Sequence, residues 1–307
     1  MVHVPVLTKE VLELLNPGQN KNFVDCTIGE GGHTILILEK NKPLGKVLGI
    51  DLDSGQIENC KLTIKDQRLI LINDSYINIK EIIEKINFGP VNGILLDLGY
   101  SSWQLEKAMK GFSFQRDEAL DMRYNGSQLL TAEKIINEYP EAEIERILQE
   151  YGEERFSRQI ANKITNHRKI KKIQTTFELK DIIEKAIPAR FRQRDARIIR
   201  FSGNSRPGKI HFATRSFQAI RIAVNGELDN LTRFLPEAIS VLTSNGRLVV
   251  ISFHSLEDRI VKNFFKNQLK KGTIKILTKK PIIASKEELL INPKARSAKL
   301  RALEYTL

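Results

Sequence analysis

The stretch from Asp25 to His33, which reads Asp-Cys-Thr-Ile-Gly-Glu-Gly-Gly-His, constrains the fold of this chain more than any other feature. The apolar pair Phe23 and Val24 precedes it, and the apolar helical pattern of residues 35–38 follows it. That order indicates a strand, a tight turn and a helix, which is how many α/β proteins bind nucleotide-like ligands. Glycine allows the backbone to approach a small molecule closely and to adopt dihedral angles that other residues disfavour. We therefore expect a ligand-binding turn here.

A second strand is expected over residues 46–50, and it ends in Asp51-Leu52-Asp53. An acidic residue about twenty positions after such glycines binds a ribose in nucleotide-type folds. The dinucleotide pattern G-x-G-x-x-G is not met, because Thr34 occupies the third glycine position. The combination looks more like the S-adenosylmethionine loop of a class I methyltransferase, whose cofactor has no pyrophosphate. We therefore predict an adenosine-bearing cofactor, with Asp51 on its ribose.

Composition excludes several classes of protein. The chain has 307 residues, 41% of them hydrophobic and 28% charged, and no apolar run approaches the ~18 residues of a membrane span. The amino terminus lacks the pattern of a secretory signal, so we expect a cytoplasmic protein with no membrane partner. The two cysteines, Cys26 and Cys60, have neither a disulfide framework nor zinc-ligand spacing. We predict no metal site.

Positive charge is concentrated in one region. The formal net charge is +12, and residues 155–221 alone carry 18 Lys or Arg against 4 Asp or Glu. The basic clusters at residues 168–172 and 190–194 are of the kind that binds the phosphate backbone of a nucleic acid. The alternatives are a solvated helix face and an anionic membrane surface. We favour nucleic acid, because solvated faces normally mix both signs of charge.

Strand and helix patterns alternate over the first hundred residues, which predicts parallel βαβ units. From residue 106 to about 209 the periodicity is helical and no strand is indicated. A long helix is then expected over residues 216–242, followed by a strand at 248–253, a helix from 256, and strands at 273–277 and 302–305 that form an antiparallel hairpin. We predict an α/β, Rossmann-like class I methyltransferase sheet at 1–105 and 214–307, with an all-helical, RNA-binding insertion at 106–213.

The carboxyl ends of parallel strands meet at one edge of a sheet, and ligands bind there. The glycine turn, Asp51, Asp97 and His254 all stand at such strand ends in this sequence. Asp97 could instead cap a turn, and His254 could be a core histidine whose hydrogen bonds are satisfied internally. Their common position favours a functional site.

Several long and unusual motifs resemble those of the 16S rRNA cytosine-N4 methyltransferases, which act on a cytidine in the decoding region of the small ribosomal subunit. The matching segments lie at residues 3–7, 25–33, 95–99, 101–102, 104–105, 111–114, 120–123, 151–156, 213–215, 251–262 and 292–297. The resemblance implies that S-adenosylmethionine contacts Gly31, Gly32, His33, Asp51, Tyr76, Asp97 and Gln104. It also implies that the partner is 16S rRNA or the small subunit, and it leaves a homodimer open.

Cytosine N4 is a poor nucleophile, so hydrogen-bond acceptors near the amine must orient it and take its proton. The sequence places Asp97, the hydroxyls of Ser101 and Ser102, and the carbonyl oxygens of residues 98 and 99 at that point, and His254 or Asp258 could share the role. Methylation at carbon 5 is disfavoured, because it requires a cysteine nucleophile and both cysteines are poorly placed. Two alternatives stay open: a catalytically inactive, RNA-binding ribosome assembly factor with this fold, and an NAD-dependent dehydrogenase.

Overall fold

The computed structural model describes residues 5–99, 109–189, 191 and 211–307, and they pack into two units. Unit 1 comprises Met1–Ser101 and Leu228–Leu307, and unit 2 comprises Ser102–Glu227. Unit 2 thus lies between the two segments that make up unit 1. Its second boundary lies at residue 227 rather than at the expected 213, because the helix that begins at Ala213 packs its apolar side chains into the core of unit 2.

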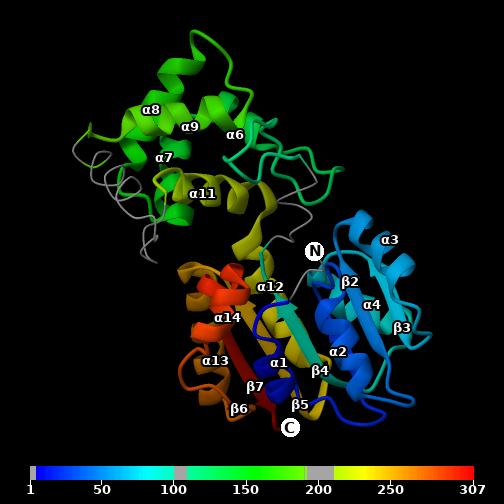
Figure 1. The fold of residues 1–307 in the computed structure, drawn as a ribbon. Helices are drawn as coiled ribbons and strands as arrows, with labels where there is room; N and C mark the ends of the chain where they lie inside the picture. The colour runs from blue at the N-terminus through cyan, green and yellow to red at the C-terminus, as the bar shows by residue number, and fades with distance from the viewer. Residues whose placement is uncertain (1–4, 100–108, 190, 192–210) are drawn as a thin grey trace. The chain divides into compact units, whose positions relative to one another are not determined.

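Unit 1 is built on one seven-stranded sheet (Figure 1). Its strands are β1 (Asn22–Asp25), β2 (Val47–Asp51), β3 (Leu69–Asn73), β4 (Val91–Asp97), β5 (Leu242–Ser252), β6 (Ile274–Ile276) and β7 (Lys299–Tyr305). The order across the sheet is β3-β2-β1-β4-β5-β7-β6. Strands β1 to β5 pair with one another in parallel, whereas β7 runs antiparallel to both β5 and β6. The predicted parallel sheet with an antiparallel edge is confirmed.

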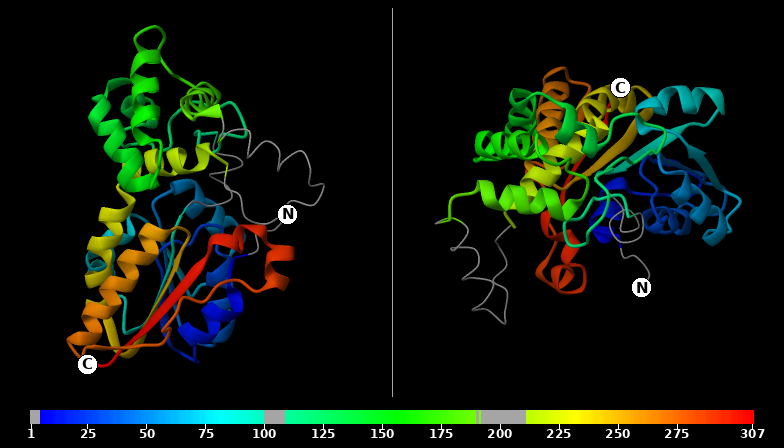
Figure 2. Two further views of the ribbon diagram at one scale, coloured as in Figure 1. Left: turned by 90° about the vertical axis from the view of Figure 1, so that its left-hand side faces the viewer. Right: turned by 90° about the horizontal axis from the view of Figure 1, so that it is seen from above.

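Helices cover both faces of this sheet (Figure 2). Those of unit 1 are α1 (Thr8–Leu15), α2 (Gly32–Lys40), α3 (Ser54–Thr63), α4 (Ile79–Lys85), α12 (Glu227–Ser240), α13 (Ser255–Lys270) and α14 (Lys286–Ile291), with short 3-10 turns at Tyr76–Asn78 and Pro293–Ser297. On one face α4, α12 and α13 bury their apolar side chains against the sheet, and on the other α1 and α2 do so. The predicted Rossmann-like α/β class is confirmed.

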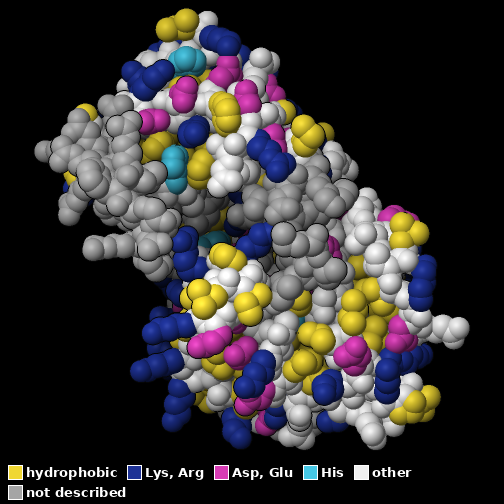
Figure 3. All heavy atoms as spheres, viewed as in Figure 1, with side chains coloured by type: hydrophobic (Ala, Val, Ile, Leu, Met, Phe, Trp, Pro, Cys, Tyr) yellow, Lys and Arg dark blue, Asp and Glu magenta, His cyan; other side chains and the backbone are white. Residues whose placement is uncertain are grey.

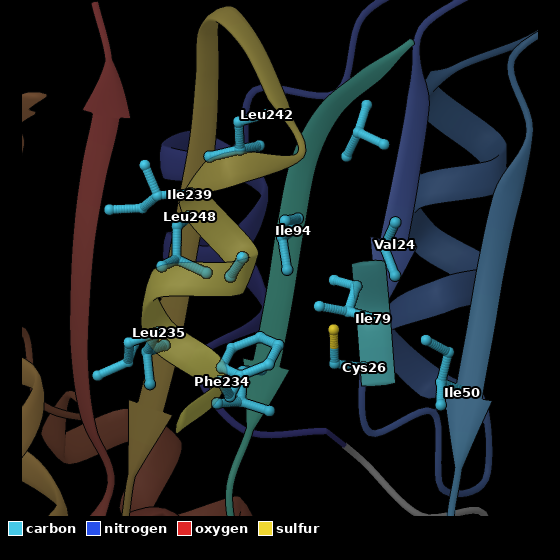
Figure 4. Packing of buried hydrophobic residues seen from close by; sticks show 14 of the residues in the cluster. Val24, Cys26, Ile50, Ile79, Ile94, Phe234, Leu235, Ile239, Leu242 and Leu248 are labelled. Atoms are coloured by element: carbon cyan, nitrogen blue, oxygen red, sulfur yellow. The ribbon is translucent and has the colours of Figure 1, made fainter. Parts of the chain in front are cut away.

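Side chains of the central strands alternate between the two apolar cores, one on each face of the sheet. In β1, Phe23 packs on the α1 and α2 side, whereas Val24 packs on the α4 and α12 side. In Figure 4, Val24 and Ile94 of neighbouring strands lie in the same layer as Phe234 of α12. Because successive side chains of a strand point to opposite faces, strands that are apolar throughout require cover on both sides. Such strands are typical of a parallel sheet.

The prediction of a single long helix over residues 216–242 is wrong. The chain forms α11 (Ala213–Asn225) and α12, and Gly226 between them has a φ of 59°, in the left-handed region that ends a helix. The periodicity of apolar residues did not reveal the helix end at this glycine, because the apolar pattern continues on both sides of it. The following strand begins at Leu242, six residues before the expected start at 248.

The described part of unit 2 is helical. It contains α6 (Ala132–Glu138), α7 (Glu141–Gly152), α8 (Ser157–Arg168), α9 (Thr176–Ala186) and α11. These helices bury one shared apolar cluster that includes Ile147, Ile164, Ile183 and Phe217. A capping box at Thr175 fixes the start of α9. Among the described residues of the whole chain, no helix is long and apolar enough to cross a membrane.

Candidate functional site

Strand order reverses between β1 and β4, so the crevice of the sheet opens at their carboxyl ends. The glycine turn follows β1, and β2 and β4 end in Asp51 and Asp97 respectively. Their parallel pairing brings these chain segments together at one edge of unit 1. The structure therefore collects at that edge three of the features that the sequence assigned to it.

The glycine turn packs closely against neighbouring side chains, which leaves no room for a Cβ atom at two of its positions. Gly31 has a φ of 81°, and a Cβ atom on it would lie 2.3 Å from the side chain of Ile64. A Cβ atom on Gly32, the first residue of α2, would lie 2.9 Å from Pro5. Any larger residue at either position would displace these neighbours. The glycines thus hold the start of α2 close to the end of β1.

Two threonines fix the polar groups beneath this turn. The buried hydroxyl of Thr34 donates to Oδ2 of Asp25 at 2.7 Å, and the backbone N–H of Asp97 donates to the hydroxyl of Thr27 at 2.7 Å. Asp25 is only 1% exposed. Thr34 therefore replaces the third glycine of the dinucleotide pattern with a hydrogen bond that holds a buried carboxylate. Asp25 supports the site from below rather than facing a ligand.

Asp51 lies at the end of β2 and faces the glycine turn. Its two carboxylate oxygens accept the backbone N–H groups of Gly29 and Asp53, each at 2.9 Å. Burial raises the pKa of Asp51 from 3.8 to about 6, although these two hydrogen bonds oppose the rise. A carboxylate has about four lone-pair positions, so two remain for a ligand. This geometry is the one expected for an acceptor of ribose hydroxyls.

Asp97 ends β4 and lies beside the start of α2. Its Oδ2 is 3.8 Å from Nε2 of His33, while its Oδ1 is shielded from solvent and has no hydrogen-bond partner among the described residues. Burial, and then the negative charges of Asp25 and Glu257, raise the pKa of Asp97 well above 3.8. A shielded carboxylate oxygen without a donor is costly unless a ligand supplies one.

Among the described residues, the carboxylates of this edge have no Lys or Arg partner. In the described parts of the chain, no Lys or Arg forms an ion pair with Asp25, Asp51 or Asp97. Burial also raises the pKa of Asp25 to about 6. Carboxylates clustered in this way favour the binding of a cation, since the cation would restore their ionised forms. The chemistry of the edge therefore fits a cationic ligand that also carries a ribose.

His254 occupies the N-cap position of α13, which follows β5. Its Nδ1 accepts the backbone N–H of Glu257 at 3.4 Å, and its Nε2 lies 3.1 Å from Oε1 of Glu257. In return, Oε2 of Glu257 accepts the N–H groups of Phe253 and His254, at 2.8 and 3.3 Å. Both ring nitrogens thus face Glu257, which favours a structural role for His254. Asp258 is engaged elsewhere, with Arg301 at 2.6 Å.

Tyr76 begins the 3-10 turn after β3 and packs edge-on against Phe234, with ring centroids 5.2 Å apart. Both cysteines are buried, and Sγ of Cys60 donates to the carbonyl oxygen of Gly29 at 3.2 Å. Burial raises the pKa of Cys60 to about 12, which keeps the thiol protonated and unreactive. A cysteine nucleophile for carbon-5 methylation is therefore disfavoured by structure as well as by sequence.

Three predicted site residues, Ser101, Ser102 and Gln104, lie outside the described residues. Conversely, sequence reasoning missed Thr27, Thr34 and Glu257 as supports of the site. Thr27 and Thr34 lie within or beside the glycine motif, but only the fold shows which backbone and side-chain groups they hold. Glu257 could have been found as the third residue after an N-cap, although a histidine is an unusual N-cap residue.

The sequence as a whole is similar to those of known proteins. A sequence model of the MraW methylase family matches residues 1–306. A protein of Heliobacterium mobile named ribosomal RNA small subunit methyltransferase H is 43% identical over 98% of each chain. A protein of the same name from Sulfurihydrogenibium sp. is 46% identical over 97% of each chain. These matches run the length of the sequence, so they include both units.

Solved structures are more distant. A putative methyltransferase from Streptococcus mutans, solved in complex with SAH, is 12% identical with a TM-score of 0.46, and the alignment covers 99% of each chain. The assignment to a family depends on the sequence matches.

Proposed function

Because the chain belongs to the MraW methylase family, we propose that it transfers a methyl group from S-adenosylmethionine to the exocyclic N4 of a cytidine in the decoding region of 16S rRNA. It is an rRNA methyltransferase, as the names of its relatives indicate, and S-adenosylmethionine is the methyl donor that its site fits. The particular cytidine, the N4 position and the roles of individual residues are our proposals. An rRNA substrate also supports action in the cytoplasm.

The observation that carries the cofactor proposal is the uncompensated carboxylate edge of unit 1. S-adenosylmethionine has two positive groups, a sulfonium and an ammonium, together with a ribose diol. Asp51 offers lone pairs at the end of β2, where a ribose is expected, and Asp97 offers a shielded oxygen that has no donor among the described residues. The residues present therefore fit this cofactor. We assign Gly31, Gly32, His33, Tyr76 and Gln104 to the same site.

When bound, the cofactor supplies an electrophilic methyl group, so the protein mainly has to align the attacking nitrogen with it. Asp97 is our candidate for orienting the amine of cytosine and accepting its proton. The burial that raises the pKa of Asp97 makes its carboxylate a stronger base. Ser101 and Ser102 follow Asp97 closely in the sequence and are proposed as further acceptors. No step of this transfer uses a metal ion, because the sulfonium already activates the methyl group.

Two basic clusters are predicted to bind RNA, and one of them already makes ion pairs and hydrogen bonds within the protein. Lys171 and Lys172 of the 168–172 cluster pair with Glu178 and Glu133, and Arg168 donates to the carbonyl oxygen of Ile136 at 2.8 Å. This cluster is therefore largely engaged within the protein. The other cluster, at residues 190–194, lies outside the described residues except for Phe191. We propose it as the main RNA contact of unit 2; a homodimer stays a prediction.

A transfer assay tests the function. Purified protein is incubated with S-adenosylmethionine labelled in its methyl group and with small subunits from cells that lack the protein. We expect label in 16S rRNA and, after digestion, in N4-methylcytidine. Label in 5-methylcytidine would contradict the assigned atom. A protein that binds the cofactor but transfers no label to subunits or to free 16S rRNA would contradict the proposal.

A further inference from the structure

A second positive surface lies on unit 1, distant in sequence from the basic region at residues 155–221. Between Arg259 and Lys286 the chain carries nine Lys or Arg and no Asp or Glu. These residues belong to α13, β6 and the loops that follow each of them. Figure 3 shows Lys and Arg side chains along the lower left edge of unit 1, where α13 and β6 lie. The positive charge of this segment does not stand out when charge is summed over long stretches, because acidic residues elsewhere in the chain offset it.

The lysines of α13 form a stripe along one side of the helix. Lys262, Lys266 and Lys270 follow one another at intervals of four residues, which keeps them on one side about 6 Å apart along the axis. The opposite side, with Val261 and Phe265, is buried against the sheet. Exposed amides accompany the stripe at Asn263 and Asn267. Lys, Asn and Gln are side chains that commonly contact phosphate and sugar in nucleic-acid complexes.

No acidic group compensates these lysines in the described part of the chain. None of Lys262, Lys266 and Lys270 takes part in an ion pair there. The nearest carboxylate in sequence, Asp258, is four residues before Lys262 but binds Arg301 at 2.6 Å and lies 3.9 Å from Lys299. Like charges four residues apart on a helix repel one another. A polyanion lying along α13 would relieve this repulsion.

Neither edge-strand protection nor membrane binding accounts for the positive charge of α13. Lysine on an edge strand prevents strand pairing between molecules, which explains Lys275 on β6 but not a helix. An anionic membrane surface favours an amphipathic helix with exposed apolar side chains, whereas the apolar side of α13 is buried and Leu269 alone is a large exposed apolar residue of that helix. RNA phosphate is the partner that fits.

The position of the stripe relates it to the proposed site. His254 and Glu257 at the start of α13 lie at the carboxyl edge of the sheet, where Glu257 influences the charge of Asp97. From that end, the sixteen residues of α13 extend about 24 Å. We propose that Lys262, Lys266 and Lys270 bind the phosphate backbone of the rRNA substrate next to the target nucleotide. This inference rests on the proposed function, since it takes rRNA as the substrate.

The test is a triple variant, Lys262→Gln, Lys266→Gln and Lys270→Gln, of the full chain, with binding to a decoding-region 16S rRNA fragment measured over a range of salt concentrations. Each lost phosphate contact lowers the salt slope by about 0.7 to 0.9, so we expect a decrease of about 2 and an affinity about 10- to 100-fold weaker at 0.1 M salt. Affinity for S-adenosylmethionine is expected to stay unchanged.

The matched control removes the same charge from the other edge of unit 1, by Lys61→Gln, Lys65→Gln and Lys85→Gln on or beside α3 and α4. The corresponding lysine-to-arginine variant of the α13 stripe is expected to bind as the wild type does. An α13 glutamine variant with the salt slope of the control would overturn the inference. Wild-type protein that neither binds nor methylates the RNA would instead contradict the proposed function.

Discussion

Asp51 and Asp97 differ in the hydrogen bonds that their carboxylates receive from the protein. Asp51 receives two backbone N–H groups, whereas Oδ1 of Asp97 receives no hydrogen bond within the described residues. The first carboxylate is therefore held in place for binding, and the second is left available to a ligand or substrate. Sequence alone placed both at strand ends. It could not distinguish them, because the difference depends on which backbone groups the folded turn directs at each carboxylate.

Asp51 should contribute to cofactor affinity through its charge. In Asp51→Asn, an amide oxygen can still accept one backbone N–H, but the ionic acceptor for the ribose hydroxyls is lost. We expect S-adenosylmethionine to bind about 2 kcal/mol more weakly, or about thirtyfold, in isothermal titration calorimetry. The control is Glu58→Gln on the exposed side of α3, which removes the same charge nearby. Equal affinities of the two variants would remove Asp51 from the site.

Asp97 should control the rate of methyl transfer. Asp97→Asn is expected to lower the single-turnover rate at saturating cofactor at least about 100-fold. In the wild type, the rate should rise with pH through the raised pKa of Asp97 and then level off, because the ionised form accepts the proton. Glu257→Gln keeps an acceptor for the N–H of Phe253 but removes a neighbouring negative charge.

The pKa of Asp97 should therefore fall in Glu257→Gln, and the rise in rate should move to lower pH. Glu288→Gln is the control, since Glu288 accepts the N–H of Leu7 at 2.7 Å in a similar contact and is not among the charges that raise the pKa of Asp97. A pH profile that is identical in wild type and both glutamate variants would show that Asp97 is not the titrating group.

At the scale of elements, three strand ends create one acidic edge. β1, β2 and β4 bring Asp25, Asp51 and Asp97 together because parallel neighbours end on the same side of a sheet. The sequence predicted this convergence well, since it follows from topology. It failed at the break between α11 and α12, where one glycine with positive φ decided the outcome and the apolar periodicity was unaffected. The strand order follows from sequence patterns that extend over many residues, whereas the end of a helix can depend on a single residue.

The acidic edge predicts a pH-dependent affinity for the cofactor. Asp25 and Asp51 have a pKa of about 6 without a cation, and a bound cation favours their ionised forms. Protons therefore compete with the cofactor, so affinity should fall as pH decreases from 7 to 5, and binding at pH 6 should release protons. Calorimetry in buffers of different ionisation enthalpy measures that release. The demethylated product, which lacks the sulfonium charge, should release fewer protons, and pH-independent binding would contradict this linkage.

At the scale of the whole molecule, the insertion of unit 2 between β4 and β5 supplies a second apolar core without changing the sheet order. The net charge of +12 comes from more than one place. Residues 190–210 and the α13 stripe are both rich in Lys or Arg, whereas Lys171 and Lys172 are paired within unit 2. Sequence counts located the first region. They missed the second because its positive charges are offset by acidic residues elsewhere when charge is summed over longer stretches.

The central claim is that this protein methylates N4 of one cytidine in small-subunit rRNA. The most direct measurement maps methylated cytidines in that rRNA from cells with the protein, without it, and with only its Asp97→Asn variant. We predict one N4-methylcytidine in the decoding region that is present with the wild-type protein, absent without it, and not restored by the variant. The same methylation in all three strains would contradict the claim, and it would leave the inactive assembly factor as the better description of this chain.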